Sequence, residues 1–149
     1  MKTDKLLVSI LMPVFNEEKH VAEAIDSILS QTYSNFELII IDDGSQDKTS
    51  QVIKKYSDER IKFYQPGRIG KVAAFNLAFS KSKGDFICLF AGDDILPKKS
   101  IEERMDSTEN YTNKPLISFS KIKTFSNIKR FDGLIIPRNN KGNLSGGAM

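Results

Sequence analysis

The sequence predicts an α/β fold in which a mostly parallel sheet carries helices on both faces. Short, nearly continuous apolar runs at residues 6–12, 36–41 and 85–90 are typical of strands that are buried on both faces of a sheet. Segments with helical apolar spacing follow these runs, and consecutive βα units of this kind favour parallel strands.

The first strand, at residues 6–12, ends at Pro13 and precedes a helix. We expect Asn16 to cap this helix, because asparagine is a favoured N-cap residue. His20, the only histidine, is expected on the surface. The residues of this helix that are expected to face the sheet are Val21, Ile25, Ile28 and Leu29.

The second strand, at residues 36–41, precedes a helix at 47–57 and a third strand at 60–64. A loop at 66–70 then leads into the third helix. The residues of the third helix that are expected to face the sheet are Val72, Phe75, Ala78 and Phe79.

The fourth strand, at residues 85–90, is followed by a helix that reaches about residue 110. Pro97 fits the first turn of this helix, and residues 116–120 are expected to form a fifth strand. The residues of this helix that are expected to face the sheet are Ile101 and Met105.

The composition is that of one globular domain. The 149 residues are 40% apolar and 28% charged, with 9 Gly and 5 Pro, which excludes a collagen-like or low-complexity chain. The sequence contains no run of ~18 apolar residues, the length that predicts a membrane-spanning helix. The single cysteine, Cys88, lies in an apolar run, so we expect a buried thiol and a reducing, cytoplasmic compartment.

Two pairs of carboxylates follow apolar strands, Asp42 with Asp43 and Asp93 with Asp94. The carboxyl ends of parallel strands meet at one edge of the sheet, where open α/β folds bind ligands. Two carboxylates ~4 Å apart repel by ~4 kcal/mol at an effective dielectric constant of about 20, so a bound cation is the simplest arrangement. Oxygen ligands without a His or Cys cluster indicate Mg²⁺ or Mn²⁺. Helix capping and turn formation are the alternative role for these residues.

Cations precede the third helix. Arg68, Gly70 and Lys71 combine a helix N-terminus, a close backbone approach and two positive charges, which together suit a diphosphate. Solvated surface charges are the alternative. Asn76, in the same helix, is expected to orient the loop or the ligand.

The net charge of +3 does not indicate a nucleic-acid partner, but the charge is unevenly distributed. Residues 121–149 contain six Lys and Arg against one Asp. This basic segment is either a solvated surface or a patch that faces phosphates or an anionic membrane.

Several motifs resemble the opening of glycosyltransferase family 2. They are VSILMPVFNEE at 8–18, SILSQTY at 27–33, ELIIIDDGSQDKT at 37–49, GKVAAFN at 70–76, GDFI at 84–87 and AGDD at 91–94. The resemblance covers about residues 6–120 and continues more weakly to 146–148. It implies a GT-A (Rossmann-like) fold, a nucleotide-diphosphate-sugar donor that is most often a UDP-sugar, and a Mn²⁺ or Mg²⁺ cofactor. It further implies inverting transfer of the sugar to an acceptor hydroxyl in polysaccharide or glycoconjugate synthesis.

The resemblance also implies roles for individual residues. Pro13 and Phe15 would border the base pocket, and Asp43 would hydrogen-bond the nucleobase. Asp93 and Asp94 would form the acidic motif, with Asp94 as the metal ligand. The expected nucleotide-sugar-binding residues are Pro13, Phe15, Asn16, Glu17, Asp43, Arg68, Gly70, Lys71, Asn76 and Asp93.

Three departures from the family pattern bear on function. Ala91 stands where the acidic motif often begins with another Asp, and Phe75 stands where Arg is common. The resemblance implies that the catalytic base is an Asp of the acceptor-binding half, which we expect beyond residue 149, and Asp132 does not match this residue. The expected organisation is a donor-binding domain at residues 1–120 and the start of a truncated acceptor-binding region at 121–149.

Two other functions are compatible with parts of this pattern. A nucleotide-sugar-binding fragment without turnover would differ only by lacking the catalytic base. A regulatory phosphoacceptor domain also gathers carboxylates and Mg²⁺ at strand ends, but it needs an acidic pair after the first strand and an Asp after the third, where this sequence has 14–16 (VFN) and 65–66 (QP). The resemblance favours the glycosyltransferase, with peripheral association at the inner membrane face as in many relatives. The sugar, the acceptor and the oligomeric state do not follow from the sequence.

Overall fold

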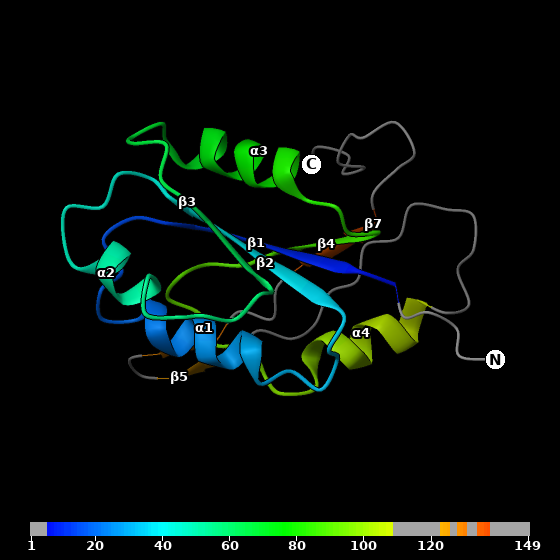
Figure 1. Cartoon of the computed structure of the whole chain (residues 1–149). Coiled ribbons are helices and arrows are strands. Elements are labelled where there is room, and N and C mark those ends of the chain that lie inside the picture. Colours follow the sequence, from blue (N-terminus) through cyan, green and yellow to red (C-terminus); the bar gives the residue numbers. More distant parts are fainter. Residues whose placement is uncertain (1–5, 109–122, 126–127, 131–133, 138–149) are drawn as a thin grey trace.

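A five-stranded sheet with the order β3-β2-β1-β4-β7 forms the centre of the protein (Figure 1). The computed structural model describes residues 6–108, 123–125, 128–130 and 134–137. The strands of the sheet are β1 (Val8–Val14), β2 (Phe36–Asp42), β3 (Ile61–Tyr64), β4 (Phe86–Leu89) and β7 (Leu134–Pro137).

The first four strands run parallel, and β7 joins the outer edge of β4 in the antiparallel direction. A separate antiparallel pair is formed by β5 (Lys123–Phe125) and β6 (Ile128–Arg130). The predicted mostly parallel sheet is therefore confirmed. The predicted fifth strand at 116–120 lies outside the described residues.

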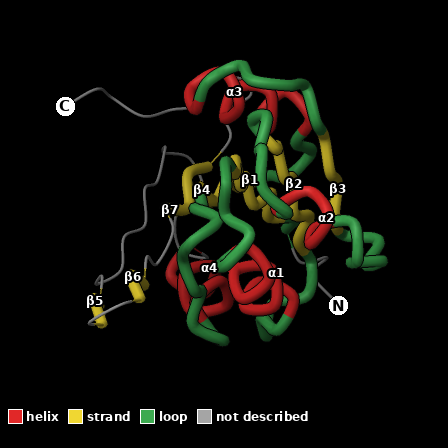
Figure 2. The backbone as a smooth tube through the Cα atoms, turned by 90° about the vertical axis from the view of Figure 1, so that its left-hand side faces the viewer, coloured by secondary structure: helices red, strands yellow, loops and turns green. Residues whose placement is uncertain are grey.

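Helices cover both faces of the sheet, as predicted (Figures 1 and 2). The helix α3 (Lys71–Lys81) packs on one face. The helices α1 (Val21–Leu29), α2 (Thr49–Ile53) and α4 (Ser100–Thr108) contribute to the core on the other face. No helix in the described part of the chain is long and apolar enough to cross a membrane.

The apolar runs form strands because side chains alternate between the two faces of a sheet. In β2, Leu38 and Ile40 belong to the core beneath α1, whereas Ile39 and Ile41 belong to the core beneath α3. All four side chains are fully buried. The thiol of Cys88 in β4 is buried as well, which confirms that prediction.

The start of α1 differs from the prediction. The helix begins at Val21, and Asn16 does not cap it. Instead, Asn16 adopts a positive φ of 56°, and its Oδ1 atom accepts a hydrogen bond from the backbone N–H of Gln46 at 2.8 Å. The turn before α1 is closed by the carbonyl of Glu17, which accepts from the N–H groups of His20 and Val21. The inward residues of α1 lie as predicted, and His20 is exposed.

The helix α2 is shorter than the predicted segment 47–57. Asp47 Oδ1 accepts from the backbone N–H of Thr49 at 2.9 Å, so Asp47 forms the turn before the helix. At the other end, the N–H of Lys55 bonds to the carbonyl of Val52 and that of Tyr56 to the carbonyl of Ile53. These bonds span three residues, and the chain leaves the α-helical path after Ile53.

The orientation of α3 corrects a further prediction. Ala74 and Ala78 are fully buried, whereas Val72, which we expected to face the sheet, is 75% exposed. Val72 lies two residues from Ala74, which is about 200° around the helix, so the two cannot share a face. Phe75 and Phe79 are half-buried at the sides of the alanine face.

The last described helix begins after Pro97, whose carbonyl accepts from the N–H of Ser100. Ile101 and Met105 are buried, as predicted. The helix reaches Thr108, and the residues between 109 and the predicted end at about 110 lie outside the described part of the chain.

Candidate functional site

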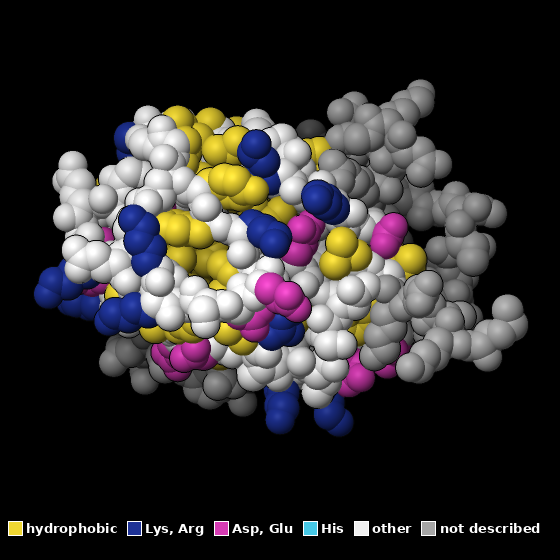
Figure 3. All heavy atoms as spheres, viewed as in Figure 1, with side chains coloured by type: hydrophobic (Ala, Val, Ile, Leu, Met, Phe, Trp, Pro, Cys, Tyr) yellow, Lys and Arg dark blue, Asp and Glu magenta, His cyan; other side chains and the backbone are white. Residues whose placement is uncertain are grey.

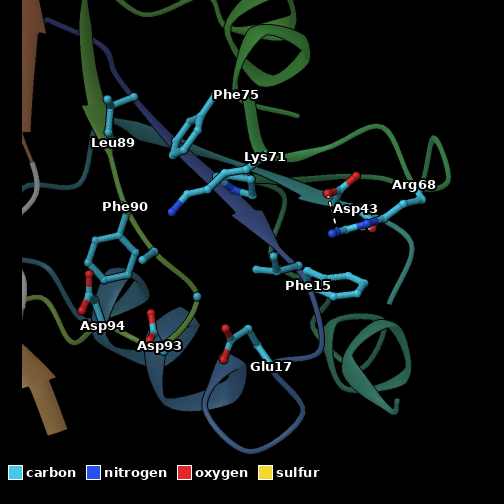
Figure 4. A pocket seen from close by; sticks show the side chains of 14 residues that line it. Phe15, Glu17, Asp43, Arg68, Lys71, Phe75, Leu89, Phe90, Asp93 and Asp94 are labelled. Atoms are coloured by element: carbon cyan, nitrogen blue, oxygen red, sulfur yellow. Dashed lines mark hydrogen bonds and ion pairs between the residues drawn. The ribbon is translucent and has the colours of Figure 1, made fainter. Parts of the chain in front are cut away.

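A pocket of about 540 Å³ opens at the carboxyl ends of β1, β2 and β4 (Figure 4). Residues from all three strand ends and from the start of α3 form its walls. The lining residues are Pro13, Val14, Phe15, Glu17, Asp43, Arg68, Lys71, Phe75, Leu89, Phe90, Ala91, Gly92, Asp93 and Asp94. The two predicted acidic positions, Asp43 and Asp94, therefore face one common pocket.

Most of the residues expected to bind a nucleotide sugar line this pocket. Three of them do not. Asn16 binds the loop after β2, Gly70 donates to Asp43, and Asn76 is exposed on α3. Those that line the pocket are Pro13, Phe15, Glu17, Asp43, Arg68, Lys71 and Asp93, and the expected metal ligand Asp94 lines it as well.

The carboxylate of Asp43 ties the loop before α3 to the end of β2. Its Oδ1 atom accepts hydrogen bonds from the backbone N–H groups of Ile69 at 2.6 Å and Gly70 at 2.8 Å. Its Oδ2 atom accepts from Arg68 Nη1 at 2.6 Å, and the side chain of Asp43 is 4% exposed. Three donors on a buried carboxylate hold this loop, and with it the first turn of α3, against the sheet.

Arg68 also stacks on an aromatic ring. Its Cζ atom lies 3.7 Å from the centroid of the Phe15 ring, which is 39% exposed. A guanidinium over a ring face forms a favourable cation–π contact. One end of the pocket is therefore a flat, partly exposed surface that combines an aromatic ring, a cation and a carboxylate (Figure 4).

Asp42 is the last residue of β2 and Asp43 follows it, and the two have different roles because consecutive residues of an extended chain point to opposite sides. The side chain of Asp42 accepts from the backbone N–H of Ser45 at 2.8 Å and from the hydroxyl of Ser50. It does not line the pocket. The sequence left turn formation open as the role of both residues. Asp42 has this role, while Asp43 lines the pocket.

Carboxylates gather at another part of the pocket, around Glu17, Asp93 and Asp94 (Figure 4). Burial raises the pKa of Glu17, and the negative charges of Asp93 and Asp47 raise it further, whereas His20 lowers it. The side chain of Asp94 is buried and that of Asp93 is exposed. Three carboxylates therefore lie at this part of the pocket.

This arrangement fits a divalent cation that is shared with a ligand. Among the residues that the structure describes, no group of three His, Cys, Asp or Glu side chains is arranged to hold a metal ion alone. Mg²⁺ and Mn²⁺ usually bind through one or two carboxylates together with substrate phosphates. Asp94 with Asp93 offers such a partial site, and Lys71 lies across the pocket from them (Figure 4).

An apolar wall completes the pocket, and the site residues expected from the sequence do not include it. Phe75 of α3 and Leu89 at the end of β4 are half-buried, and Phe90 is 2% exposed. Gly92 permits a close turn here, because a Cβ atom at this position would lie 2.6 Å from a methyl carbon of Val14. In Figure 3, apolar side chains (yellow) are exposed on this face of the molecule and have Lys or Arg side chains (dark blue) and Asp or Glu side chains (magenta) beside them. For Leu89 and Phe90, the available signal was their position at the end of a strand, whereas Phe75 lies in a helix.

Sequence comparison shows that the chain is similar to glycosyltransferases. A family model described as glycosyl transferase family 2 matches residues 9–140. An uncharacterized glycosyltransferase of Haemophilus influenzae is 40% identical over 103 residues, which are 67% of this chain and 41% of that protein. The putative glycosyltransferase EpsE of Bacillus subtilis is 38% identical over 108 residues, 70% of this chain and 39% of EpsE. The chain thus spans about two fifths of the length of these relatives.

Solved structures share its fold. TarS 1–349 of S. aureus, in complex with UDP-GlcNAc, superposes with a TM-score of 0.74 at 24% identity, covering 81% of this chain and 36% of TarS 1–349. The mannosyltransferase PcManGT from Pyrobaculum calidifontis, in complex with GDP-Man and Mn²⁺, superposes with a TM-score of 0.70 at 22% identity, covering 80% of this chain and 36% of PcManGT. These likenesses confirm the predicted GT-A fold.

Proposed function

This chain belongs to glycosyltransferase family 2, and from that premise we propose that it binds the nucleotide-diphosphate-sugar donor for transfer of a sugar, with inversion, to an acceptor hydroxyl. The observation that carries the proposal is that Asp43 and Asp94 line one pocket of about 540 Å³. A pocket of this size suits a small-molecule ligand that reaches from one carboxylate to the other.

The nucleobase would lie at the end formed by Phe15, Asp43 and Arg68. An ionised carboxylate has about four acceptor positions, and Asp43 uses three of them within the protein. One position is left for an N–H group of a base, which suits the imide N–H of uracil. Guanine carries such an N–H as well, so our proposal of a UDP-sugar donor rests also on the family resemblance, which most often implies a UDP-sugar.

The diphosphate would lie in the middle of the pocket, beside Lys71 and the first turn of α3. A lysine and a helix N-terminus both favour phosphate groups. Asp94, assisted by Asp93, would hold the Mn²⁺ or Mg²⁺ ion on the other side. The cation supplies positive charge that stabilises the leaving nucleoside diphosphate as the glycosidic bond breaks. Complexes of UDP-GlcNAc with TarS and of GDP-Man and Mn²⁺ with PcManGT support this assignment.

The acceptor would be bound by the region that begins at residue 121, and the general base would come from that part of the enzyme. A base must approach the acceptor hydroxyl to about 2.6–3.2 Å, or through one water. The basic character of residues 121–149 supports peripheral contact with the anionic inner face of a membrane. A role in polysaccharide or glycoconjugate synthesis is proposed from the family resemblance alone. A phosphoacceptor function does not fit the family match.

Calorimetric titration of nucleotide sugars, with and without Mn²⁺, tests the proposal. We expect a UDP-sugar to bind and its affinity to rise with the metal. Absence of binding by UDP-, GDP- and dTDP-sugars under both conditions would overturn the proposal. A sugar-transfer assay on the same protein separates an enzyme from a binding fragment without turnover.

A further inference from the structure

The pocket has two ends of different chemistry. Phe15, Asp43 and Arg68 lie at one end, and Phe75 and Leu89 lie at the opposite end, with Lys71 between them (Figure 4). Lys71 and Phe75 are four residues apart on α3, so they are neighbours on the same face of the helix. A ligand that places its base at the first end and its diphosphate beside Lys71 therefore extends toward Phe75.

The end near Phe75 is apolar. Phe75 and Leu89 are partly buried and pack against the core beneath α3, so their positions are fixed by Leu11, Ile87 and their neighbours. Ala91 and Gly92, which follow on the strand end, add no polar side chain. The side chains of Phe75, Leu89 and Ala91 present hydrocarbon to the ligand, and a hydroxyl pressed against them would lose water without gaining a partner from these three residues.

We propose that Phe75 and Leu89 form a subsite for a methyl-bearing donor sugar, either an acetamido sugar or a 6-deoxy sugar. This inference rests on the proposed function, because it uses the direction in which the donor lies. The methyl group packs against the Phe75 ring and is removed from water there. A small apolar pocket discriminates one carbon group by about 10-fold to 200-fold.

Two matched pairs of donors test the subsite by calorimetry in the presence of Mn²⁺. UDP-GlcNAc and UDP-glucose differ by an acetamido group in place of a hydroxyl. GDP-6-deoxymannose and GDP-mannose differ by a methyl group in place of a hydroxymethyl group. We expect the methyl-bearing member of at least one pair to bind about tenfold more tightly or better. The pair that shows the preference identifies which methyl source the subsite takes.

Substitution of Phe75 assigns the preference to this residue. We expect Phe75→Ala to reduce the ratio of affinities within the preferred pair to about threefold or less. Phe79→Ala is the matched control, because Phe79 lies one turn further along α3, is also half-buried and does not line the pocket. This control is expected to keep the wild-type ratio.

A measurement on the unmodified protein covers the case in which Phe75→Ala does not fold. Saturation-transfer NMR with irradiation of the aromatic protons should give the strongest transfer within the sugar to its methyl protons. Three results would each overturn the subsite. The affinities could be equal within both pairs, or the preference could persist in folded Phe75→Ala. The third is a saturation transfer to the methyl protons that is no stronger than the transfer to the sugar-ring protons. Absence of binding by UDP-, GDP- and dTDP-sugars, with and without Mn²⁺, would instead overturn the proposed function, and the subsite with it.

Discussion

Asp43 binds the side chain of Arg68 through Oδ2, at 2.6 Å from Nη1, while its Oδ1 atom holds two backbone N–H groups of the same loop. One carboxylate thus shapes the loop before α3 and also faces the pocket. Its removal should affect both the stability of the protein and the recognition of the base.

We predict that Asp43→Ala lowers the free energy of unfolding by about 2 kcal/mol, because charge-assisted hydrogen bonds to a buried carboxylate are lost. It should also reduce discrimination among nucleobases. Urea denaturation and competition between UDP, CDP and ADP measure the two effects. Asp58→Ala removes an ion pair with Arg60 whose carboxylate is more exposed than that of Asp43, 26% against 4%, and should cost less than about 1 kcal/mol. Unchanged base discrimination in Asp43→Ala would remove this residue from the base subsite.

Asp94→Asn should weaken donor binding mainly when Mn²⁺ or Mg²⁺ is present, since the amide is a poorer ligand for a hard cation. We expect a loss of about tenfold or more with metal and little change in a chelator. Titration under both conditions measures the difference. Asp106→Asn, an exposed position on α4 away from the pocket, is the control. An equal loss in chelator would contradict the role of Asp94 as a ligand.

Gly44 packs directly on the loop that Asp43 holds. Its φ is +76°, and a Cβ atom there would lie 2.9 Å from the backbone nitrogen of Arg68. We predict that Gly44→Ala destabilises the protein by more than ~1 kcal/mol and weakens nucleotide binding, because both the backbone and the loop must shift.

Gly67→Ala provides the comparison for that change. Gly67 has a similar φ of +85°, but a Cβ atom there meets nothing within 4 Å. Gly67→Ala should therefore lose only the stability that the unfavourable backbone conformation costs. If thermal melting shows that Gly44→Ala and Gly67→Ala lose the same stability, the contact with Arg68 does not contribute to the destabilisation by Gly44→Ala.

Glu17 should make stability depend on pH. Burial and the charge of Asp93 raise its pKa above the usual value of 4.5. The folded protein therefore holds this proton to higher pH than the unfolded chain does, and the free energy of unfolding falls as pH rises above 4.5. We predict that Glu17→Gln makes this fall smaller and raises stability at pH ~7.

Urea denaturation over the range from about pH 4 to pH 7 measures the effect of Glu17. Glu23→Gln, at an exposed position on α1, should keep the wild-type profile. If the pH profile of unfolding free energy is the same for Glu17→Gln and the wild type, Glu17 does not contribute to the pH dependence of stability.

Cys88 should be unreactive in the folded protein. Burial raises the pKa of its thiol to about 12, so the thiolate that reacts is scarce at neutral pH. We expect no labelling by a thiol reagent at pH ~8 until urea unfolds the chain. Because Cys88 is the single cysteine, the labelled fraction reports unfolding directly. Rapid labelling of the native protein would mean that β4 opens readily.

The strands could be predicted from sequence because fully buried strands of a parallel sheet require apolar residues on both faces. The hydrogen-bond partners of the polar residues could not be predicted from the sequence. Asn16 has the chemistry of a helix cap, yet its side chain accepts a hydrogen bond from the backbone N–H of Gln46, thirty residues later in the chain. Local propensity does not include such long-range partners.

The candidate site shows the same limit. Asp43 and Asp94 could be placed at one edge because strand ends converge there, and the structure brings both to one pocket. The contacts of Asp43 with Ile69 and Gly70 depend on a loop with two glycines at positive φ, whose path is set by tertiary packing. Phe75 was predicted as a core residue, and the structure shows it half-buried with one side at the pocket.

The antiparallel strand β7 pairs with β4 along its whole length, from Phe86 opposite Pro137 to Leu89 opposite Leu134. A version shortened before β7 would leave the outer edge of β4 without its backbone partners. Open edges of this kind recruit strands from other molecules. Shortened versions should therefore aggregate, and a minimal donor-binding unit for biophysical work needs to retain residues 134–137.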